Sequence, residues 1–161
     1  MIDWPLDLNR IRRGSESNTF GMVRRRADGT AKPHQGWDFY ASSGTPVYAV
    51  AAGKVSTVSD GGDYGLTIIH SFQHDGRTLY AAYAHMKSAA VKPGDSVVLG
   101  QQIGLSGNSG NARTMKGEDQ HLHFEVRTVA LPGRGLGGRI SPKEIFNVCP
   151  IRDSIKRKGG E

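Results

Sequence analysis

Short runs of β-forming residues bounded by glycines constrain the fold of this chain more than any other feature of its sequence. The 161 residues include 22 glycines, and the segments between several of them are rich in residues that favour strands. Glycine also supplies the backbone freedom that tight turns need. We therefore predict an all-β fold, with clear strands over residues 46–51, 54–58, 64–69 and 78–83.

One short helix is predicted near the C-terminus, where Ser141 can cap, Pro142 suits the first turn and Glu144 completes a capping box. A weak internal repeat is also present. Gly44-Thr-Pro-Val47, which leads to a second glycine, is similar to Gly94-Asp-Ser-Val97. The repeat suits a sheet built from two related hairpin units.

Length and composition predict one compact domain. A hydrophobic content of 37% is enough for a core, and no apolar run approaches the length of a membrane span, so membrane insertion is not expected. We expect an N-terminal arm over residues 1–18, in which Trp4 and Leu6 pack on the body. The main domain then covers residues 19–147, and a basic polar tail covers residues 148–161.

The histidines carry the strongest functional signal. The chain has six, and four of them lie in His34-Gln-Gly-Trp-Asp38, in His121-Leu-His123 and at His85. A catalytic zinc ion usually takes three protein ligands drawn from histidine, aspartate and glutamate, and these motifs supply that number. The other two histidines precede an Asp-Gly turn, and we expect them to be structural or exposed to solvent.

The spacing of these residues predicts ligands on strands and loops. Successive side chains of a strand alternate between faces, so His121 and His123 should point the same way, with Leu122 in the opposite layer. Pro33 and Gly36 indicate a turn that enters a strand. Each motif alone could be a local ion pair or an exposed histidine pair. Together they indicate a metallohydrolase, in which one imidazole binds metal and another faces a metal-activated water.

An ordered set of motifs is similar to the lysostaphin-type zinc endopeptidases, the M23 peptidases of the LytM class. The resemblance covers residues 19–147 and is far more specific than any one motif. The matching segments are Ser17-Asn-Thr-Phe-Gly-Met-Val-Arg24, His34-Gln-Gly-Trp-Asp38, Gly44-Thr-Pro-Val-Tyr-Ala-Val-Ala-Ala-Gly53, Tyr83-Ala-His85, Val91-Lys-Pro-Gly-Asp95, Gly100-Gln-Gln-Ile-Gly104 and His121-Leu-His-Phe-Glu-Val-Arg127.

The resemblance implies a site and an activity. His34, Asp38 and His123 would bind Zn²⁺, while His85 and His121 would form the catalytic pair, without indicating which is the base. The implied fold has antiparallel sheets forming a groove with the zinc at its floor. The implied reaction is hydrolysis of peptide stems or cross-links in bacterial peptidoglycan. Both D-alanine–diaminopimelate cross-links and glycine bridges stay open as substrates, and no substrate-binding residue is identified.

The chain departs from the family pattern at two places. Residues 111–120 lengthen a loop before His121, at the rim of the expected site, where loops set substrate choice. Asp28 occupies a position at which some relatives have a tyrosine. If a phenol assists catalysis, Tyr83 is the nearest by motif, but a tyrosine on an apolar strand is expected in the core.

The export route stays open. The first residues lack the charged and apolar regions of a signal peptide, whereas peptidoglycan lies outside the cytoplasm. Either the chain comes from a longer exported precursor, or it leaves by a route that needs no signal. We favour an antibacterial effector or lysin that acts on the cell wall, and an effector would need an immunity protein as partner.

The formal net charge of +6 favours retention on an anionic wall. The basic clusters are discontinuous and lack interleaved aromatic residues, so nucleic-acid binding is not expected.

Two alternatives to an active zinc endopeptidase remain. One is a metal-free LytM-like module that binds the cell wall or activates another hydrolase. Such a module normally lacks some of the metal ligands, and none is missing from this sequence. The other is a basic β domain for nucleic acid or lipid, which leaves the histidines unexplained. Cys149, the single cysteine, is expected to be a semi-buried thiol.

Overall fold

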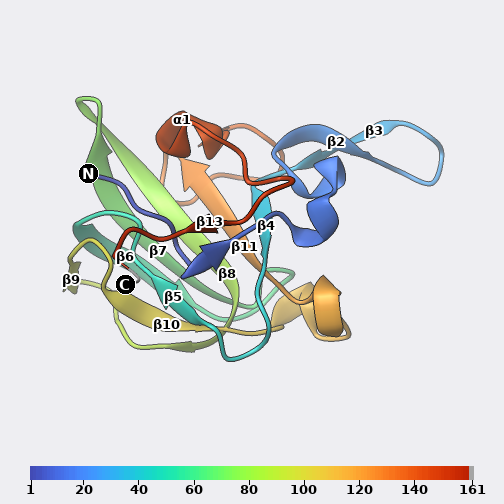
Figure 1. Ribbon diagram of the computed structural model, residues 1–161. Coiled ribbons are helices and arrows are strands. Elements are labelled where there is room, and N and C mark those ends of the chain that lie inside the picture. Colours follow the sequence, from blue (N-terminus) through green and yellow to red (C-terminus); the bar gives the residue numbers. More distant parts are fainter. Residues whose placement is uncertain (160–161) are drawn as a thin grey trace.

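The computed structural model describes residues 1–159, which fold mostly into antiparallel strands (Figure 1). The all-β prediction is confirmed. Within these residues the main sheet has nine strands, in which β12, β11, β8, β7, β6 and β9 are successive neighbours. β4 joins at β11, and β10 connects β8 with β5. The strands are β1 Leu8–Asn9, β2 Gly21–Arg25, β3 Ala31–His34, β4 Trp37–Tyr40, β5 Pro46–Tyr48, β6 Gly53–Ser59, β7 Leu66–His74, β8 Arg77–Ala89, β9 Ser96–Val97, β10 Gln102–Ser106, β11 His121–Arg127, β12 Arg139–Ile140 and β13 Ile155–Lys156.

The β7–β8 hairpin forms the centre of the main sheet. Its two turn residues, Asp75 and Gly76, have φ angles of 49° and 78°, which is the left-handed geometry of a tight two-residue hairpin. β8 runs over residues 77–89, well beyond the predicted 78–83. The reason is its second partner, because β8 pairs with β11 along its first part and with β10 beyond it. The local sequence pattern of residues 77–89 does not predict that second pairing.

Strand β11 separates the core from the polar side of the sheet. All seven of its residues are buried. Leu122, Phe124 and Val126 belong to the hydrophobic core, whereas His121 and His123 face the opposite way, as the two-residue period of a strand requires. The core behind β11 also contains the large side chains of Trp37, Phe39, Phe72, Tyr83 and Phe146.

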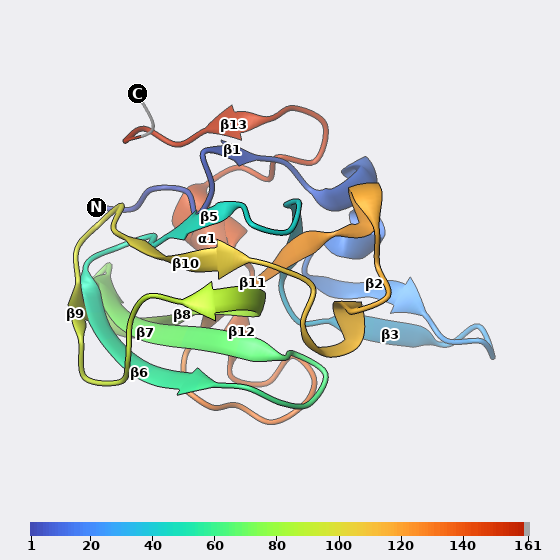
Figure 2. The same cartoon turned by 90° about the horizontal axis from the view of Figure 1, so that it is seen from below.

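The N-terminal arm and the C-terminal segment pair with each other. β1 and β13 form a two-stranded sheet at one edge of the molecule (Figure 2). Trp4 and Leu6 are buried as expected, and the Trp4 ring stacks on Phe146 at 4.2 Å. The expected tail therefore lies on the body. The boundaries at residues 18 and 147 stay predictions, and Gly160 and Glu161, at the end of the expected tail, lie outside the described residues.

The predicted helix is present as α1, Lys143–Phe146, but the capping box is wrong. Ser141 Oγ accepts a hydrogen bond from the backbone N–H of Lys143 at 3.2 Å. The Glu144 carboxylate, however, accepts from Arg77 at 3.2 Å instead of turning back to the cap. The Arg77 guanidinium, at the end of the β7–β8 hairpin, thus competes with the helix N-terminus for the Glu144 carboxylate. Four 3-10 segments complete the described elements: η1 Arg12–Gly14, η2 Glu16–Asn18, η3 Gly110–Ala112 and η4 Gly117–Asp119.

The β2–β3 hairpin projects from the body (Figure 1) and forms a separate two-stranded sheet. Asp28 lies in its turn, where it accepts hydrogen bonds from Thr30.

The first glycines of the two copies of the sequence repeat adopt similar backbone conformations, with φ of 94° at Gly44 and 93° at Gly94. Among the residues described, the helices are all too short to cross a membrane.

Candidate metal centre

His34 and Asp38 reach the site from two short strands joined by a tight turn. His34 ends β3, and Asp38 is the second residue of β4. The turn between them passes so close to β11 that a Cβ on Gly36 would lie 2.2 Å from the Phe124 carbonyl oxygen. Only glycine fits there. This close approach lets β4 pair with β11 in a register that sets Asp38 opposite His123.

The Asp38 carboxylate lies at the centre of the cluster. Its Oδ1 is 2.8 Å from His123 Nδ1 and 3.2 Å from His34 Nε2, and ligand atoms of the three buried residues all lie within 4.8 Å of one another. Two imidazole nitrogens and one carboxylate oxygen form a donor set that suits zinc and leaves room for a fourth ligand. The residues present therefore fit a metal ion.

Three histidines are oriented by the backbone. In each of them Nδ1–H donates to a backbone carbonyl oxygen at 2.8 Å. The acceptor is the carbonyl of Thr19 for His34, that of Ser109 for His85 and that of Asp119 for His121. In each ring this leaves Nε2 as the nitrogen without a proton in the neutral form.

His85 adopts φ 58°, a left-handed conformation that is costly for a residue with a side chain. Its backbone N–H donates to the Tyr64 carbonyl at 2.9 Å. Strain of this kind is maintained only where the surroundings enforce it.

The five residues that the sequence predicts for the site all come together. The rings of His85 and His121 are 4.9 Å apart, and His121 Nε2 lies 3.7 Å from Asp38 Oδ1. The His34 and His123 rings are 5.1 Å apart. Which of these residues bind metal and which move protons stays a prediction.

A buried carboxylate that sequence reasoning missed holds His123. Glu125 Oε1 lies 2.9 Å from His123 Nε2, and its other oxygen accepts from Arg127 at 2.7 Å and from Arg139 at 2.8 Å. A carboxylate on the far nitrogen fixes the ring and leaves Nδ1 for a metal. The sequence does contain a signal, because Glu125 follows His123 by two residues and so shares its face of β11.

The phenol at the site is Tyr64. Its hydroxyl donates to Glu125 and accepts from Gln35, and its ring centre lies 5.1 Å from that of His123. Tyr83, the tyrosine weighed from its motif, is fully buried in the core. Tyr64 stands in a glycine-rich turn before β7, and no spacing pattern in the sequence indicates it.

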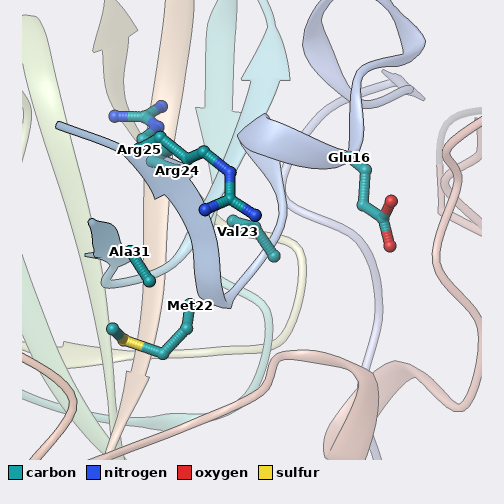
Figure 3. A pocket seen from close by; sticks show the side chains of 6 residues that line it. All are labelled: Glu16, Met22, Val23, Arg24, Arg25 and Ala31. Carbon is teal, nitrogen blue, oxygen red and sulfur yellow. The ribbon is translucent and has the colours of Figure 1, made fainter. Parts of the chain in front are cut away.

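Two arginines, also missed, contact the outer oxygen of Asp38. Arg12 Nη2 donates to Asp38 Oδ2 at 3.1 Å and Arg24 Nη2 at 3.0 Å. Arg24 also borders a hollow of ≈ 270 Å³ under the β2–β3 hairpin, beside Met22 and Ala31 (Figure 3). Arg24 thus lines this hollow and also contacts Asp38.

Charge and burial set the protonation of the cluster. Burial alone would raise the pKa of Asp38, but the hydrogen bond from His123 and the contact with His34 hold it well below its usual value. Burial would lower the pKa of His123, yet Asp38 and Glu125 raise it to about 9. Burial and then the neighbouring His121 and His123 lower the pKa of His85 to about 4, and burial lowers that of His121. The imidazoles of His85 and His121 are thus neutral near pH 7, beside the three residues that fit a metal ion.

The lengthened loop over residues 111–120 contacts the N-terminal arm. Arg13 and the Asp119 carboxylate form two hydrogen bonds, of 2.6 and 3.1 Å, and the η1 and η4 segments meet at one end of the molecule (Figure 2). Because the Asp119 carbonyl orients His121, this loop supports the site directly.

Comparison with known proteins agrees with this geometry. The model of Peptidase family M23 matches residues 32–135. The peptidoglycan DD-endopeptidase ShyA of Vibrio cholerae is 38% identical over 126 residues, which are 78% of this chain and 25% of ShyA. The chain therefore spans about a quarter of that relative.

Two solved structures share the fold. A zinc-containing peptidase from Vibrio cholerae has a TM-score of 0.62 at 32% identity, covering 76% of this chain and 35% of that one. The catalytic domain of the antimicrobial peptidase lysostaphin from Staphylococcus simulans has a TM-score of 0.63 at 27% identity, covering 81% and 90%. With the family model spanning most of the chain, this protein belongs to peptidase family M23.

Proposed function

We propose that this chain is a zinc-dependent endopeptidase that hydrolyses peptide bonds in the stems or cross-links of bacterial peptidoglycan. The observation that carries the proposal is the convergence of His34, Asp38 and His123 on one point, with two further imidazoles at its edge. ShyA, by its name, acts on peptidoglycan, and the similar solved structure from Vibrio cholerae contains zinc. Both names support the substrate class and the metal.

His34 Nε2, Asp38 Oδ1 and His123 Nδ1 would hold the metal. When bound there, zinc would supply Lewis acidity, which polarises a scissile carbonyl and lowers the pKa of water. The imidazole and carboxylate donors suit zinc among the common divalent ions. Glu125 keeps the proton of His123 on Nε2, so that Nδ1 is free to act as a ligand.

His121 is placed to accept a proton. Its Nδ1–H is committed to the Asp119 carbonyl, so Nε2 carries the lone pair, and the nearby Asp38 carboxylate favours the protonated ring that results. His85 has the same arrangement at the Ser109 carbonyl, and its ring lies 4.9 Å from that of His121, but no contact between His85 and Asp38 like that of His121 is present among residues 1–159. We assign His121 as the proton acceptor and His85 as the second imidazole that contacts the reacting peptide.

The finer identity of the target stays a proposal. Cross-links between D-alanine and diaminopimelate and glycine bridges are both compatible with the site. An exported antibacterial effector or lysin remains our prediction, supported by the description of lysostaphin as an antimicrobial peptidase. The immunity protein that an effector would need also stays a prediction.

Metal analysis and digestion of purified sacculi test the proposal. We expect near-stoichiometric zinc in the folded protein and released wall peptides whose masses identify the cleaved bond. His121→Ala should keep the zinc but lose activity by about 10²–10⁴-fold, because it removes proton transfer and no ligand. A folded protein that binds no metal would instead favour the degenerate wall-binding module. Full activity of His121→Ala would refute the assigned proton acceptor.

A further inference from the structure

The side chain of Arg12 contacts two parts of the candidate metal centre at once. Arg12 lies in the N-terminal arm, outside the region matched by the family model. Its Nη2 donates to Asp38 Oδ2 at 3.1 Å, and its Nη1 lies 3.4 Å from the Asp119 carbonyl oxygen. The same carbonyl accepts Nδ1–H of His121 at 2.8 Å. One guanidinium therefore connects a ligand with the proposed proton acceptor.

The position of Arg12 is fixed by the surrounding protein. Nη2 also donates to Asn18 Oδ1 at 2.7 Å, and the Asn18 amide donates back to the Arg12 carbonyl at 2.9 Å. The side chain is only 12% exposed. Its Nε is buried without a partner among residues 1–159. A buried donor left unpaired is costly, and this cost accompanies the Nη1 and Nη2 contacts with Asp38, Asn18 and the Asp119 carbonyl.

The contact with Asp38 selects the oxygen that faces the ligands. A carboxylate can turn about its last side-chain bond, which exchanges its two oxygens. The guanidiniums of Arg12 and Arg24 both hold Oδ2, at 3.1 and 3.0 Å, while Oδ1 faces the imidazoles. Arg24 is 31% exposed, so water screens its charge more than that of Arg12. Arg12 therefore holds this orientation more strongly.

We propose that Arg12 is a positioning residue of the metal centre. It keeps Asp38 Oδ1 turned towards His34 and His123, and it keeps the Asp119 carbonyl in place for His121. The N-terminal arm is then part of the catalytic unit. This assignment rests on the proposed metal-dependent function.

The test compares Arg12→Gln, Arg12→Lys and a matched control, Arg13→Gln. Arg13 lies next in the same arm and pairs with the Asp119 carboxylate, but it does not contact Asp38 within the described part of the chain. Zinc affinity is measured by competition with a chromophoric chelator. The visible spectrum of the cobalt-substituted protein reports ligand geometry, which a merely structural role would leave unchanged.

We expect Arg12→Gln to weaken zinc binding by about 10–100-fold and to change the cobalt spectrum, with Arg13→Gln within about twofold of the unmodified protein. Activity should fall through kcat, with KM nearly unchanged, because the substrate is not contacted. Arg12→Lys keeps the charge but has a single donor group in place of the fork, so it should restore the affinity and spectrum only in part.

Each outcome decides the assignment. Thermal unfolding of the metal-free variants establishes that they fold, and if Arg12→Gln does not, Arg12→Lys provides the same comparison. Zinc affinity and cobalt spectrum unchanged in the folded Arg12 variant would overturn the assignment and leave the proposed function intact. Absence of metal binding by the unmodified protein would overturn both.

Discussion

The buried histidine of strand β7 and the buried histidines around Asp38 differ in how their nitrogens are used. His70 on β7 has its Nδ1 3.0 Å from the Ser71 carbonyl and its Nε2 2.9 Å from the Tyr83 hydroxyl, which also accepts the Val50 N–H at 3.0 Å. In the Asp38 cluster, His85 and His121 bond the backbone through Nδ1 only. Burial is similar in the two places, so burial alone does not mark a functional histidine.

The difference lies in which atoms have partners. The His70–Tyr83 pair satisfies its polar groups within the protein, as buried scaffold groups do. Around Asp38 the backbone fixes the rings of His34, His85 and His121, and Glu125 fixes that of His123. One nitrogen of each ring is left free of these contacts, as in a pre-organised site. Variants in each group can test this contrast.

Replacement of a proposed ligand should have the largest effect. His123→Ala removes one of three donors, and we expect zinc binding to be lost and hydrolysis of sacculi to fall to background. Metal analysis after dialysis, together with a turbidity assay of sacculi, measures both. Stoichiometric zinc in this variant would show that the ligands lie elsewhere.

Glu125→Gln should have the second largest effect. The variant leaves the buried guanidiniums of Arg127 and Arg139 without their counter-charge, which costs about 3–5 kcal/mol of unfolding free energy, and it should weaken zinc binding by about 10–100-fold. The matched control is Glu144→Gln, which breaks the half-exposed pair with Arg77 and should cost at most about 0.5 kcal/mol. Urea unfolding compares the two, and equal costs would contradict the role given to burial.

Zinc affinity should rise with pH below about 9. The metal-free site holds a proton on His123, whose pKa is raised to about 9, and a metal must displace it from Nδ1. Below that pH, affinity should therefore increase about tenfold per pH unit. Calorimetry in buffers with different ionisation enthalpies would count the released proton. Release of none near neutral pH would contradict the second proton assigned to His123 in the metal-free site.

His70→Leu should have the smallest effect. It removes the hydrogen bond to Tyr83 and should cost about 1–3 kcal/mol, with activity unchanged within about twofold. Burial lowers the pKa of His70, so the unfolded chain binds a proton below about pH 6.5 that the folded chain does not. The free energy of unfolding of the unmodified protein should therefore decrease as the pH falls below about 6.5. In His70→Leu this decrease should be less steep.

Urea unfolding at pH 7.5 and 5.5 measures this, with His74→Gln as the control. His74 lies on the same strand near Asp75, at 3.5 Å and partly exposed. A large loss of activity in His70→Leu would break the distinction between the two histidine groups.

Cys149 belongs with the scaffold. Its side chain is partly buried, and burial raises the pKa of its thiol to about 11. A thiol of this kind stays protonated near neutral pH and is a poor nucleophile. The expectation of a semi-buried free thiol is confirmed.

The sequence by itself determined the donor types, their order and their local direction. The two-residue period of a strand sets His121 and His123 on one face of β11 whatever surrounds them, and the glycine-bounded runs specify short β-strands. These properties depend on residues that are near one another in the chain. They could therefore be predicted without the structure.

Only the tertiary structure decided what surrounds the donors. The register of β4 on β11 places Asp38 beside His123, although the two residues are 85 apart in sequence. Arg12 reaches Asp119 from 107 residues away, and the phenol near the site comes from Tyr64 and not from Tyr83. Such contacts follow from how strands and the N-terminal arm pack together, and packing depends on the whole chain because no local spacing encodes it.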